Sequence, residues 1–440
     1  MNKTSPILLA LFLVLAGCSE KASAQNWPQF RGPYQTGVVD QFEIPTSWSI
    51  EKNLAWKVPS PGQGWSSPIV WEDKVFVSCS RLKGEDFSDS QDRSKRDRIS
   101  VLNEYELAIH CYDLNSGQEL WSQVAFSGQP LIPTHRRSTY ANETPVTDGE
   151  RVFVYFGPMG LYCYDLDGNL LWKKDLGVYP MEKDWGTGSS PVIHDDLVYL
   201  QIDNEENSFV VALDTESGEE RFHIPREEGS NWSNPMIWQN KLRTELVTQG
   251  SMVRSYDSKS GELLWTLKQS GGRNNSTPSG NEDLLFVGNE KRGGGGVLYA
   301  VKAGATGDIT PADGEFSSSG VAWSNPNGGI AMASPLVYQG YVYAFERESS
   351  RVNCYVAETG EVAYYRKPIP DSGDFWSSPW GYDGKVYCVD GNGLTHVLAA
   401  GEEFNLLGQF PLNDQIWATP AITPGSIVFR GVNNIYCVRN

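Results

Sequence analysis

The sequence predicts an all-β protein, an eight-bladed β-propeller whose blades are four-stranded antiparallel sheets. Three observations predict it: a motif of about ten residues recurs along the chain, a Ser/Thr/Asn-Pro pair opens each repeat at a regular interval, and the two chain ends together supply one repeat. Self-similarity at a fixed period indicates a repeat architecture. A repeat that accommodates four short strands is typical of a propeller blade.

The recurring motif joins two strands through a tight turn and places a large aromatic side chain on the second strand. The clearest copies are residues 112–121, YDLNSGQELW, and residues 256–265, YDSKSGELLW. Related segments are residues 164–172, 213–222 and 355–364. In each turn an Asp, Ser or Thr oxygen can accept hydrogen bonds from nearby backbone N–H groups, and a Gly supplies the positive φ that closes the hairpin.

Each repeat begins with a Ser, Thr or Asn that is followed by Pro. The eight marker prolines are Pro68, Pro145, Pro191, Pro235, Pro278, Pro335, Pro379 and Pro420. Five of the seven intervals between them span 41 to 46 residues, and the intervals of 77 and 57 residues contain insertions. Eight markers therefore predict eight blades.

The two ends of the chain are expected to share the last blade. Residues 416–438 are predicted to hold only three strands, whereas residues 54–58 form an additional strand before the first marker and carry Trp56 at the motif position. When this N-terminal strand completes the last blade, the ring closes and the exposed edges of an open array disappear.

The N-terminus has the features of an export signal. Residues 7–17, ILLALFLVLAG, are too short to span a bilayer and follow Lys3, so residues 1–17 are predicted to be a signal peptide. The signal runs into Leu-Ala-Gly-Cys, the pattern of a bacterial lipobox, in which Cys18 is acylated. Residues 18–26 would then be a lipid-anchored tether, and residues 27–440 the propeller.

These features predict a lipoprotein on the periplasmic side of the outer membrane. The alternative is cleavage after Ala24 and release as a soluble protein, because Ala22-Ser23-Ala24 also fits a cleavage site. Both interpretations predict export.

Composition narrows the range of partners. The chain has 440 residues, a net charge of −18 and 15 Trp. The negative charge disfavours nucleic acid or an anionic lipid surface as the main partner. We therefore expect a monomeric propeller that binds a protein of the cell envelope or a small ligand.

The seven cysteines do not form an obvious disulfide framework. Cys111, Cys163, Cys354 and Cys437 occupy one repeat position, where other repeats have Ala, Ser or Val. A position that accepts only small residues indicates a packing constraint, so these thiols are predicted to act as small hydrophobes. Cys79 and Cys388 lie in other strands, and the sequence leaves their pairing open.

The long insertions are predicted to gather on one face. With the strands of a blade named A to D from the axis outward, the A–B and C–D turns are short and open on the same face. The insertions at 81–107 and 288–296 are assigned to B–C connections, and those at 127–143 and 310–333 to D–A connections, which open on the other face. One-sided insertions usually mark the binding face of a repeat protein, although drift in unselected loops is the alternative.

The D–A connections deliver the chain to the innermost strand, so their last residues are expected to surround the mouth of the axial channel. Trp65, Trp232, Trp376 and Trp417 each lie three residues before a marker Pro, and Trp185 lies six residues before one. They could form an aromatic floor or wall for a flat ligand or a partner side chain. The alternative is that they pack between blades.

A cluster of cations is expected beside these Trp residues. The connection before Pro145 carries His135, Arg136 and Arg137, and Glu143 and Arg273 are expected nearby. Cations clustered on an acidic protein suggest an anionic ligand or a carboxylate contact. Ion pairing with neighbouring blades is the alternative.

The Ser/Thr/Asn-Pro start and the D-x-x-[ST]-G-x-x-x-W finish of the repeats resemble the PQQ-type β-propeller repeat with its tryptophan-docking motif. Residues 27–33, WPQFRGP, also resemble the opening of exported bacterial propellers described as similar to BamB, the lipoprotein of the outer-membrane β-barrel assembly machinery. The resemblance covers nearly all of residues 27–440. It implies a non-catalytic binding or scaffold protein with a partner at the cell envelope.

The same repeat occurs in PQQ-dependent dehydrogenases, which are similar in blade count and hold Ca²⁺ with Glu, Asn and Asp beside the quinone. By that resemblance, a Ca²⁺ site would be sought among Asn142, Glu143, Asp184, Asn274 and Asn275. The chain has no adjacent cysteines and no Cys-x-x-Cys-His haem motif. No cofactor and no metal are therefore predicted, and PQQ with Ca²⁺ belongs only to the enzyme alternative.

Other chemistries find less support, because the five His show no zinc-ligand spacing and no G-x-S-x-G nucleophile motif is present. We interpret the chain as an exported, lipid-anchored, non-catalytic propeller that engages a partner or ligand at the loop-rich channel mouth. The first alternative is a quinoprotein dehydrogenase that oxidises an alcohol or a sugar. A second is a carbohydrate binder that uses the Trp side chains.

Overall fold

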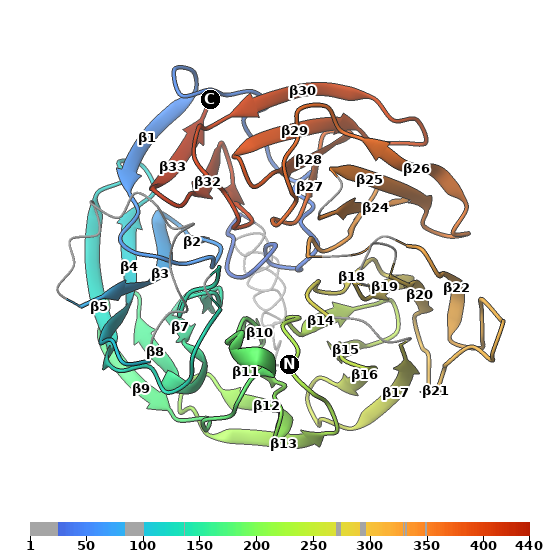
Figure 1. The fold of residues 1–440 in the computed structure, drawn as a ribbon, viewed down its shortest axis with the longest axis horizontal. Helices are drawn as coiled ribbons and strands as arrows, with labels where there is room; N and C mark the ends of the chain where they lie inside the picture. Colours follow the sequence, from blue (N-terminus) through green and yellow to red (C-terminus); the bar gives the residue numbers. More distant parts are fainter. Residues whose placement is uncertain are drawn as a thin grey trace, which may run out of the picture.

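The computed structural model describes residues 25–83, 101–135, 137–269, 274–290, 296–328, 330, 332–347 and 350–440. Eight β-sheets stand around a central axis, and each forms one blade (Figure 1). Helix is limited, in this described part of the chain, to two short 3₁₀ turns, η3 (Gly157–Met159) and η4 (Glu182–Asp184). The predicted eight-bladed propeller is confirmed.

The first four blades follow one another in sequence from the first marker Pro. Blade 1 contains β2 (Ile69–Trp71), β3 (Lys74–Leu82), β4 (Tyr105–Asp113) and β5 (Glu119–Gly128). Blade 2 contains β6 (Val146–Thr147), β7 (Arg151–Tyr155), β8 (Leu161–Asp165) and β9 (Leu170–Lys174). Blade 3 contains β10 (Val192–His194), β11 (Leu197–Ile202), β12 (Ser208–Asp214) and β13 (Glu220–Arg226). Blade 4 contains β14 (Met236–Gln239), β15 (Thr244–Thr248), β16 (Met252–Asp257) and β17 (Leu263–Lys268).

The last four blades complete the ring. Blade 5 contains β18 (Ser279–Gly280), β19 (Leu284–Gly288), β20 (Leu298–Lys302) and β22 (Val321–Asn325). Blade 6 contains β23 (Leu336–Tyr338), β24 (Tyr341–Glu346), β25 (Arg351–Val356) and β26 (Val362–Pro368). Blade 7 contains β27 (Trp380–Tyr382), β28 (Lys385–Val389), β29 (Leu394–Ala399) and β30 (Leu406–Pro411). Blade 8 contains β31 (Ala421–Thr423), β32 (Ser426–Arg430), β33 (Asn434–Arg439) and, from the N-terminal side, β1 (Leu54–Pro59).

Blade 8 is built from both ends of the chain, as the sequence predicts. Strand β1 pairs antiparallel with β33, with Lys57 opposite Tyr436 and Pro59 opposite Asn434. In Figure 1 the two strands lie side by side where the colours of the N-terminal and C-terminal parts meet. This pairing closes the ring.

Four of the motif tryptophans connect one blade to the next. The indole Nε1–H of Trp121 donates a hydrogen bond of 3.0 Å to the Leu166 carbonyl of blade 2, and the ring lies directly over Gly168. A Cβ atom at Gly168 would lie 2.8 Å from a ring carbon of Trp121, so the turn requires glycine there. The same bond joins Trp56 to Leu114 O, Trp172 to Thr215 O and Trp323 to Ala357 O. The recurring motif is therefore a blade-to-blade lock.

One of the four long insertions lies on the other face, contrary to the prediction. Residues 303–320 join the third and fourth strands of blade 5, β20 and β22, so this insertion leaves from the face with the short turns. Within it, β21 (Gly307–Asp308) adds a fifth, parallel strand to the outer edge of blade 4, and Ile309 is buried against Trp265 and its neighbours. The assignment of 310–333 to a D–A connection is wrong, because the Gly320 and Trp323 of the motif come only after the insertion.

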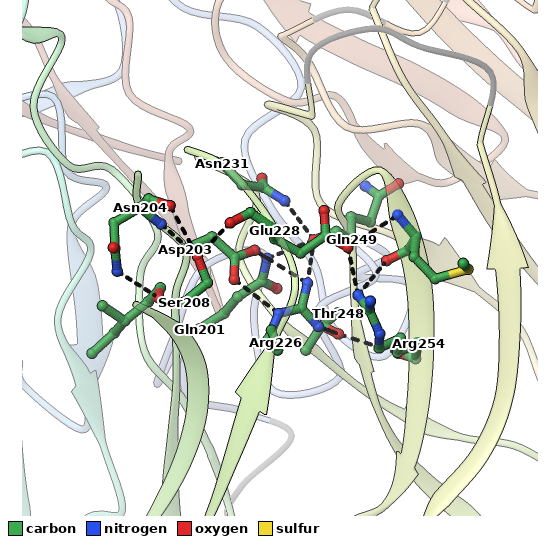
Figure 2. Close-up of polar contacts among 12 residues, drawn as sticks. Gln201, Asp203, Asn204, Ser208, Arg226, Glu228, Asn231, Thr248, Gln249 and Arg254 are labelled. Atoms are coloured by element: carbon green, nitrogen blue, oxygen red, sulfur yellow. Dashed lines mark hydrogen bonds and ion pairs between the residues drawn. The ribbon is translucent and has the colours of Figure 1, made fainter. Parts of the chain in front are cut away.

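A buried polar network stiffens blades 3 and 4 on the face of the D–A connections. Figure 2 shows its centre, the pair formed by Arg226 and Asp203, which bond at 2.8 and 3.1 Å with both side chains fully buried. Gln201 donates to Asp203 at 2.7 Å and to the Gln249 carbonyl at 2.6 Å. Arg226 also donates to Thr248, so the network ties the ends of β11, β13 and β15 together.

The thiols pack as the sequence predicts. The six cysteines within the described ranges are free and buried; they are Cys79, Cys111, Cys163, Cys354, Cys388 and Cys437. Cys18, the predicted acylation site, and the predicted signal peptide lie outside the described residues. Among the residues that are described, no helix has the length and apolar character needed to cross a bilayer.

Candidate functional site

The residues that precede each marker Pro build one axial cavity. They are extended as they approach the innermost strand, and alternate side chains of an extended chain point to opposite sides. Side chains one and three positions before each Pro line the cavity, whereas those two positions before are buried in the walls, apart from Ala418, which also lines it. The cavity has a volume of about 420 Å³, within the range of small-molecule sites.

The lining forms two layers. The base ring comprises the residues one position before each Pro: Ser67, Thr144, Ser190, Asn234, Thr277, Ser334, Ser378 and Thr419. The upper ring comprises the residues three positions before: Trp65, Asn142, Gly188, Trp232, Asn275, Met332, Trp376 and Trp417. The base is thus uniformly polar, whereas the upper layer is half aromatic.

The base ring is held together by hydrogen bonds that run around the axis. Each joins a backbone N–H to the side-chain oxygen of the next blade, and six are formed: Ser67–Thr144 (3.0 Å), Thr144–Ser190 (3.0 Å), Ser190–Asn234 (2.6 Å), Thr277–Ser334 (3.0 Å), Ser334–Ser378 (3.0 Å) and Ser378–Thr419 (2.8 Å). At the six markers that accept these bonds, Ser, Thr or Asn supplies the acceptor that the preceding blade uses. The Pro that follows keeps the residue extended.

A segment near the N-terminus closes the cavity from below. Residues 27–39, here called the plug, cross the centre of the ring, and Phe30 forms part of the cavity lining (Figure 1). Trp27 exchanges two backbone hydrogen bonds with Val70 of blade 1, at 2.8 and 2.9 Å. Gly37 and Val39 bond in the same way to Gly381 of blade 7. The axial channel is therefore a blind pocket.

Three long side chains of the plug form hydrogen bonds with backbone groups at the edges of the innermost strands, as a neighbouring strand would do. The Gln35 amide accepts from Ile237 N–H at 2.9 Å and donates to Pro235 O at 3.1 Å, as a paired strand would. Gln29 accepts from Ile193 N–H at 3.0 Å. Arg31 donates to Pro335 O at 2.9 Å. These bonds satisfy inner strand edges that would otherwise be buried without partners.

One side of the cavity is a continuous stack of aromatic rings. Trp417 lies between Trp65 and Trp376, with ring centroids 4.4 and 5.2 Å away, and the Arg347 guanidinium lies 5.4 Å from the Trp376 ring. The faces of Trp417 are therefore covered by its neighbours. This side presents ring edges to the cavity, and the edge of an aromatic ring carries partial positive charge.

The opposite side holds a second aromatic group. Trp185 and Trp232 contact each other with centroids 5.5 Å apart, and His135 meets the Trp185 ring edge-on at 6.4 Å. The Trp232 indole donates to Gly186 O at 2.8 Å, which fixes the ring. The Lys183 ammonium lies 5.4 Å from the Trp185 ring. A ligand in the cavity would lie between these two aromatic walls.

The structure brings together seven of the ten predicted site residues. They are Trp65, His135, Arg137, Trp185, Trp232, Trp376 and Trp417, all of which line the cavity. Arg136 and Arg273 lie outside the described residues. Trp65 donates to the Arg137 carbonyl at 3.0 Å, so an aromatic residue anchors the cationic loop directly.

Glu143 is placed differently, because it lies two positions before Pro145 and faces the wall. The same position in other blades carries Ser or Ala, such as Ser66 and Ala333. Glu143 is fully buried, and its Oε1 atom has no hydrogen-bond partner in the described protein. Burial raises the pKa of Glu143 to about 7, although a hydrogen bond from Thr187 and two from backbone N–H groups oppose the shift.

Two of the donors expected for Ca²⁺ are engaged with protein groups. No group of three or more His, Cys, Asp or Glu side chains suited to a metal occurs among the described residues. The Asn142 amide is committed to Thr139, Ser138 and the Thr187 carbonyl. Asn275 donates to Glu290 at 3.1 Å. Asn142 and Asn275 are therefore engaged with protein neighbours.

Sequence reasoning missed several cavity residues. Arg347 follows β24, pairs with Glu290 at 3.4 Å and covers Trp376, and Asp374 lines the rim beside it. No spacing in the sequence points to either residue. The base ring, in contrast, carried a visible signal, because the Ser/Thr/Asn before each Pro recurs eight times.

Comparisons with known proteins agree with this architecture. Residues 106–245 match the family model described as "Outer membrane protein assembly factor BamB". No curated protein sequence matches the chain. Among solved structures, BamB from Moraxella catarrhalis has a TM-score of 0.60 at 10% identity, covering 88% of this chain and 97% of that one.

Quinoprotein dehydrogenases share the fold to a similar degree. The quinohemoprotein alcohol dehydrogenase ADHIIG from Pseudomonas putida HK5 has a TM-score of 0.59 at 10% identity, covering 96% of this chain and 81% of that one. The enzyme from Comamonas testosteroni has a TM-score of 0.50 at 14% identity, covering 96% and 84%. The resemblance to PQQ-type, BamB-like propellers is confirmed for repeat and fold. Both an assembly factor and enzymes share that fold, so fold alone assigns no activity.

Proposed function

We propose that the protein is a non-catalytic binding propeller of the bacterial cell envelope, which captures an anionic ligand or an acidic group of a partner protein in the blind axial pocket. The observation that carries this proposal is the pocket itself. It has a closed base, two aromatic walls and a volume suited to a small ligand or a partner side chain. The match of residues 106–245 to a family described as an outer membrane assembly factor supports a protein partner.

The charges at the rim favour an anion. Arg137 and Arg347 line the pocket of a protein whose net charge is −18, and His135 lies beside them, so positive charge is concentrated where the rest of the molecule is acidic. The indole N–H groups of Trp376 and Trp417 have no hydrogen-bond partner in the described part of the chain, and they are available as donors. Asp374 also lines the rim and would repel an anion locally. Arg137 and Arg347 bring positive charge to the mouth, although Glu290 offsets part of the Arg347 charge.

The location follows from the N-terminal sequence and from the family match. We propose acylation at Cys18 and anchoring on the periplasmic side of the outer membrane, with residues 18–26 as the tether. Mass spectrometry of the mature N-terminus tests this point, because an acylated Cys18 and a cleavage after Ala24 give different masses. Cleavage after Ala24 would reject the anchor and leave the binding proposal intact.

The binding proposal is tested with a pair of matched double variants. Trp376→Ala with Arg137→Ala removes one wall ring and one rim cation. Leu242→Ala with Lys259→Ala removes one exposed apolar side chain and one exposed cation on the face with the short turns. Crosslinking in native membranes and direct ligand titration measure capture, and thermal unfolding checks the fold. Loss of capture only in the first variant supports the proposal; equal loss in both rejects it.

The alternative is PQQ- and Ca²⁺-dependent oxidation of an alcohol or sugar. A planar, carboxylate-bearing quinone suits the aromatic walls and rim cations, and this is the observation in its favour. Two of the expected Ca²⁺ donors, Asn142 and Asn275, are hydrogen-bonded to protein groups, and this weighs against it. Addition of PQQ and Ca²⁺ to the purified protein tests it: tight binding with dye-linked alcohol or sugar oxidation would replace the binding proposal.

A further inference from the structure

We infer that the base of the axial pocket is an oxyanion site, which receives a carboxylate, sulfonate or phosphate group at the end of the ligand. This inference rests on the proposed function and deepens it, because it states which end of the ligand enters first. It comes from the direction of the hydrogen bonds in the base ring.

Every linked hydroxyl in the base ring accepts a hydrogen bond and has none to donate to. The Oγ atoms of Ser190, Ser334 and Ser378 and the Oγ1 atoms of Thr144 and Thr419 each accept a backbone N–H from the preceding blade. No acceptor for their own O–H groups lies within hydrogen-bond distance among the described residues. A hydroxyl has one hydrogen to donate and all five line the cavity, so these O–H groups are free to rotate and donate to a ligand held there.

Asn234 extends the pattern to a sixth blade. Its Oδ1 atom accepts the Ser190 N–H at 2.6 Å, so its NH₂ group remains as a donor on the cavity side. Assigned this way, the amide matches the hydroxyls, with an oxygen toward the neighbouring blade and hydrogens toward the axis. Six blades therefore aim donors at one region.

The base carries no negative charge that would favour a cation. All eight members of the base ring are neutral, and the nearest acidic member of the same segments, Glu143, faces the wall. Phe30 closes the bottom with an aromatic side chain. Converging neutral donors in a partly dehydrated pocket stabilise an oxyanion, because their dipoles are already oriented.

The rim and the base would bind different parts of one ligand, first at the mouth and then at the bottom of the pocket. Arg137 and Arg347 attract an anion to the mouth, the ring edges of Trp376 and Trp417 admit a flat apolar body, and the donors of the base receive the oxyanion. A ligand with a charged end and an aromatic or otherwise apolar middle fits this order. Free inorganic phosphate or sulfate fits only the base.

The base ring itself supplies conservative test variants. Ser378→Asn keeps an oxygen that can accept the Ser334 N–H and adds N–H donors, as Asn234 does naturally. Ser378→Asp keeps the same acceptor but replaces the donor by a charged oxygen. Asn234→Asp makes the same change isosterically, and Asn234→Ser restores a hydroxyl of the kind found in other blades. Each pair differs in what faces the cavity, whereas the blade-to-blade link is retained.

Binding is measured by Trp fluorescence and calorimetry with benzoate, its neutral match benzyl alcohol, sulfate and phosphate. We expect benzoate to bind at least tenfold more tightly than benzyl alcohol, and sulfate to compete with it. Ser378→Asn and Asn234→Ser keep a donor at the base, so each should bind benzoate at least tenfold more tightly than the Asp variant at the same position. Ser378→Asp and Asn234→Asp should weaken it at least tenfold, with thermal unfolding little changed.

Three results would overturn the inference: benzyl alcohol binding as tightly as benzoate, equal affinity in the Asp and Asn variants, or no binding of any oxyanion probe. Its failure is separable from failure of the proposed function. If Trp376→Ala with Arg137→Ala still abolishes partner capture while the oxyanion probes remain silent, only the base site is wrong. If capture is also unaffected, the pocket is not the binding site.

Discussion

The indole ring of Trp323 lies against Gly360 of the next blade, and its Nε1–H donates a hydrogen bond of 2.9 Å to the Ala357 carbonyl. Two structural features require glycine at position 360. Its φ is +75°, which L side chains rarely adopt, and a Cβ would lie 2.5 Å from a ring carbon of Trp323. Both the positive φ and the contact with the Trp323 ring therefore disfavour a side chain at Gly360.

These two contributions can be separated with a matched glycine. Gly340 has a similar φ of +81°, but a Cβ atom added there would have no other atom within 4 Å. Gly340→Ala should cost about 1 kcal/mol from backbone strain alone. Gly360→Ala should cost a further 1–3 kcal/mol or so because the Trp323 ring must move. Equal denaturant midpoints for the two variants would contradict this account of the lock.

The buried pair in blades 3 and 4 should be far more sensitive than a surface pair. Arg226→Ala leaves the fully buried carboxylate of Asp203 without its partner, and we expect a loss of about 3–5 kcal/mol in the free energy of unfolding. Arg221→Ala removes the exposed partner of Asp214 and should cost much less, because solvent screens an exposed ion pair. Chemical denaturation of both variants measures the difference, and similar losses would show that water or nearby groups compensate Asp203.

The plug should contribute to stability through its side-chain amides. Gln35→Leu removes the partners of the Ile237 N–H and the Pro235 carbonyl, both at a buried strand edge, and should cost about 2–4 kcal/mol. Gln118 is exposed in a turn, so Gln118→Leu should change stability by less than about 0.5 kcal/mol. If Gln35→Leu unfolds at the same denaturant concentration as Gln118→Leu, the plug is dispensable for the fold.

Glu143 should make stability depend on pH. Its pKa of about 7 in the folded protein lies above the ordinary 4.5, so the folded state holds the proton more tightly than the unfolded state. This contribution is complete below about pH 4.5 and is lost as the pH rises through about 7. Glu143→Gln cannot ionise and should therefore gain up to about 3 kcal/mol relative to the unchanged protein between pH 5 and pH 8.

Urea unfolding of both proteins at several pH values measures this difference directly, because titrations elsewhere in the molecule cancel between them. A constant offset across the range would show that Glu143 ionises normally in the fold. If the stability advantage of Glu143→Gln became smaller as the pH rises, the pKa of Glu143 would be lowered in the folded protein rather than raised.

Much of the fold could be predicted because its signals are local. The Ser/Thr/Asn-Pro markers and the Gly-Trp motif are each set by one turn or one strand start, so their spacing gave the number of blades. Trp376 and Trp417 were predicted to be neighbours because equivalent repeat positions meet at the axis. The insertion assigned to residues 310–333 was misplaced because it lies between β20 and β22, where it separates the two halves of the motif.

The rest of the site depends on contacts between distant residues. Gln29 and Gln35 bond to blades 3 and 4, and nothing in their sequence neighbourhood distinguishes them from exposed glutamines. Arg347 joins the aromatic wall only because Trp376 and Glu290 lie beside it in space. The stacking of Trp65 on Trp417 likewise depends on ring orientation, which repeat spacing does not specify.

The pairing of β1 with β33 has a consequence for how the molecule is made. During synthesis the N-terminal residues emerge first, yet β1 can find its neighbour only after nearly all of the remaining chain has followed. Until then β1 lacks its strand partner, and seven blades stand as an open arc. We expect newly made chains to spend that interval vulnerable to proteases and to mispairing, and to become resistant in a single late step.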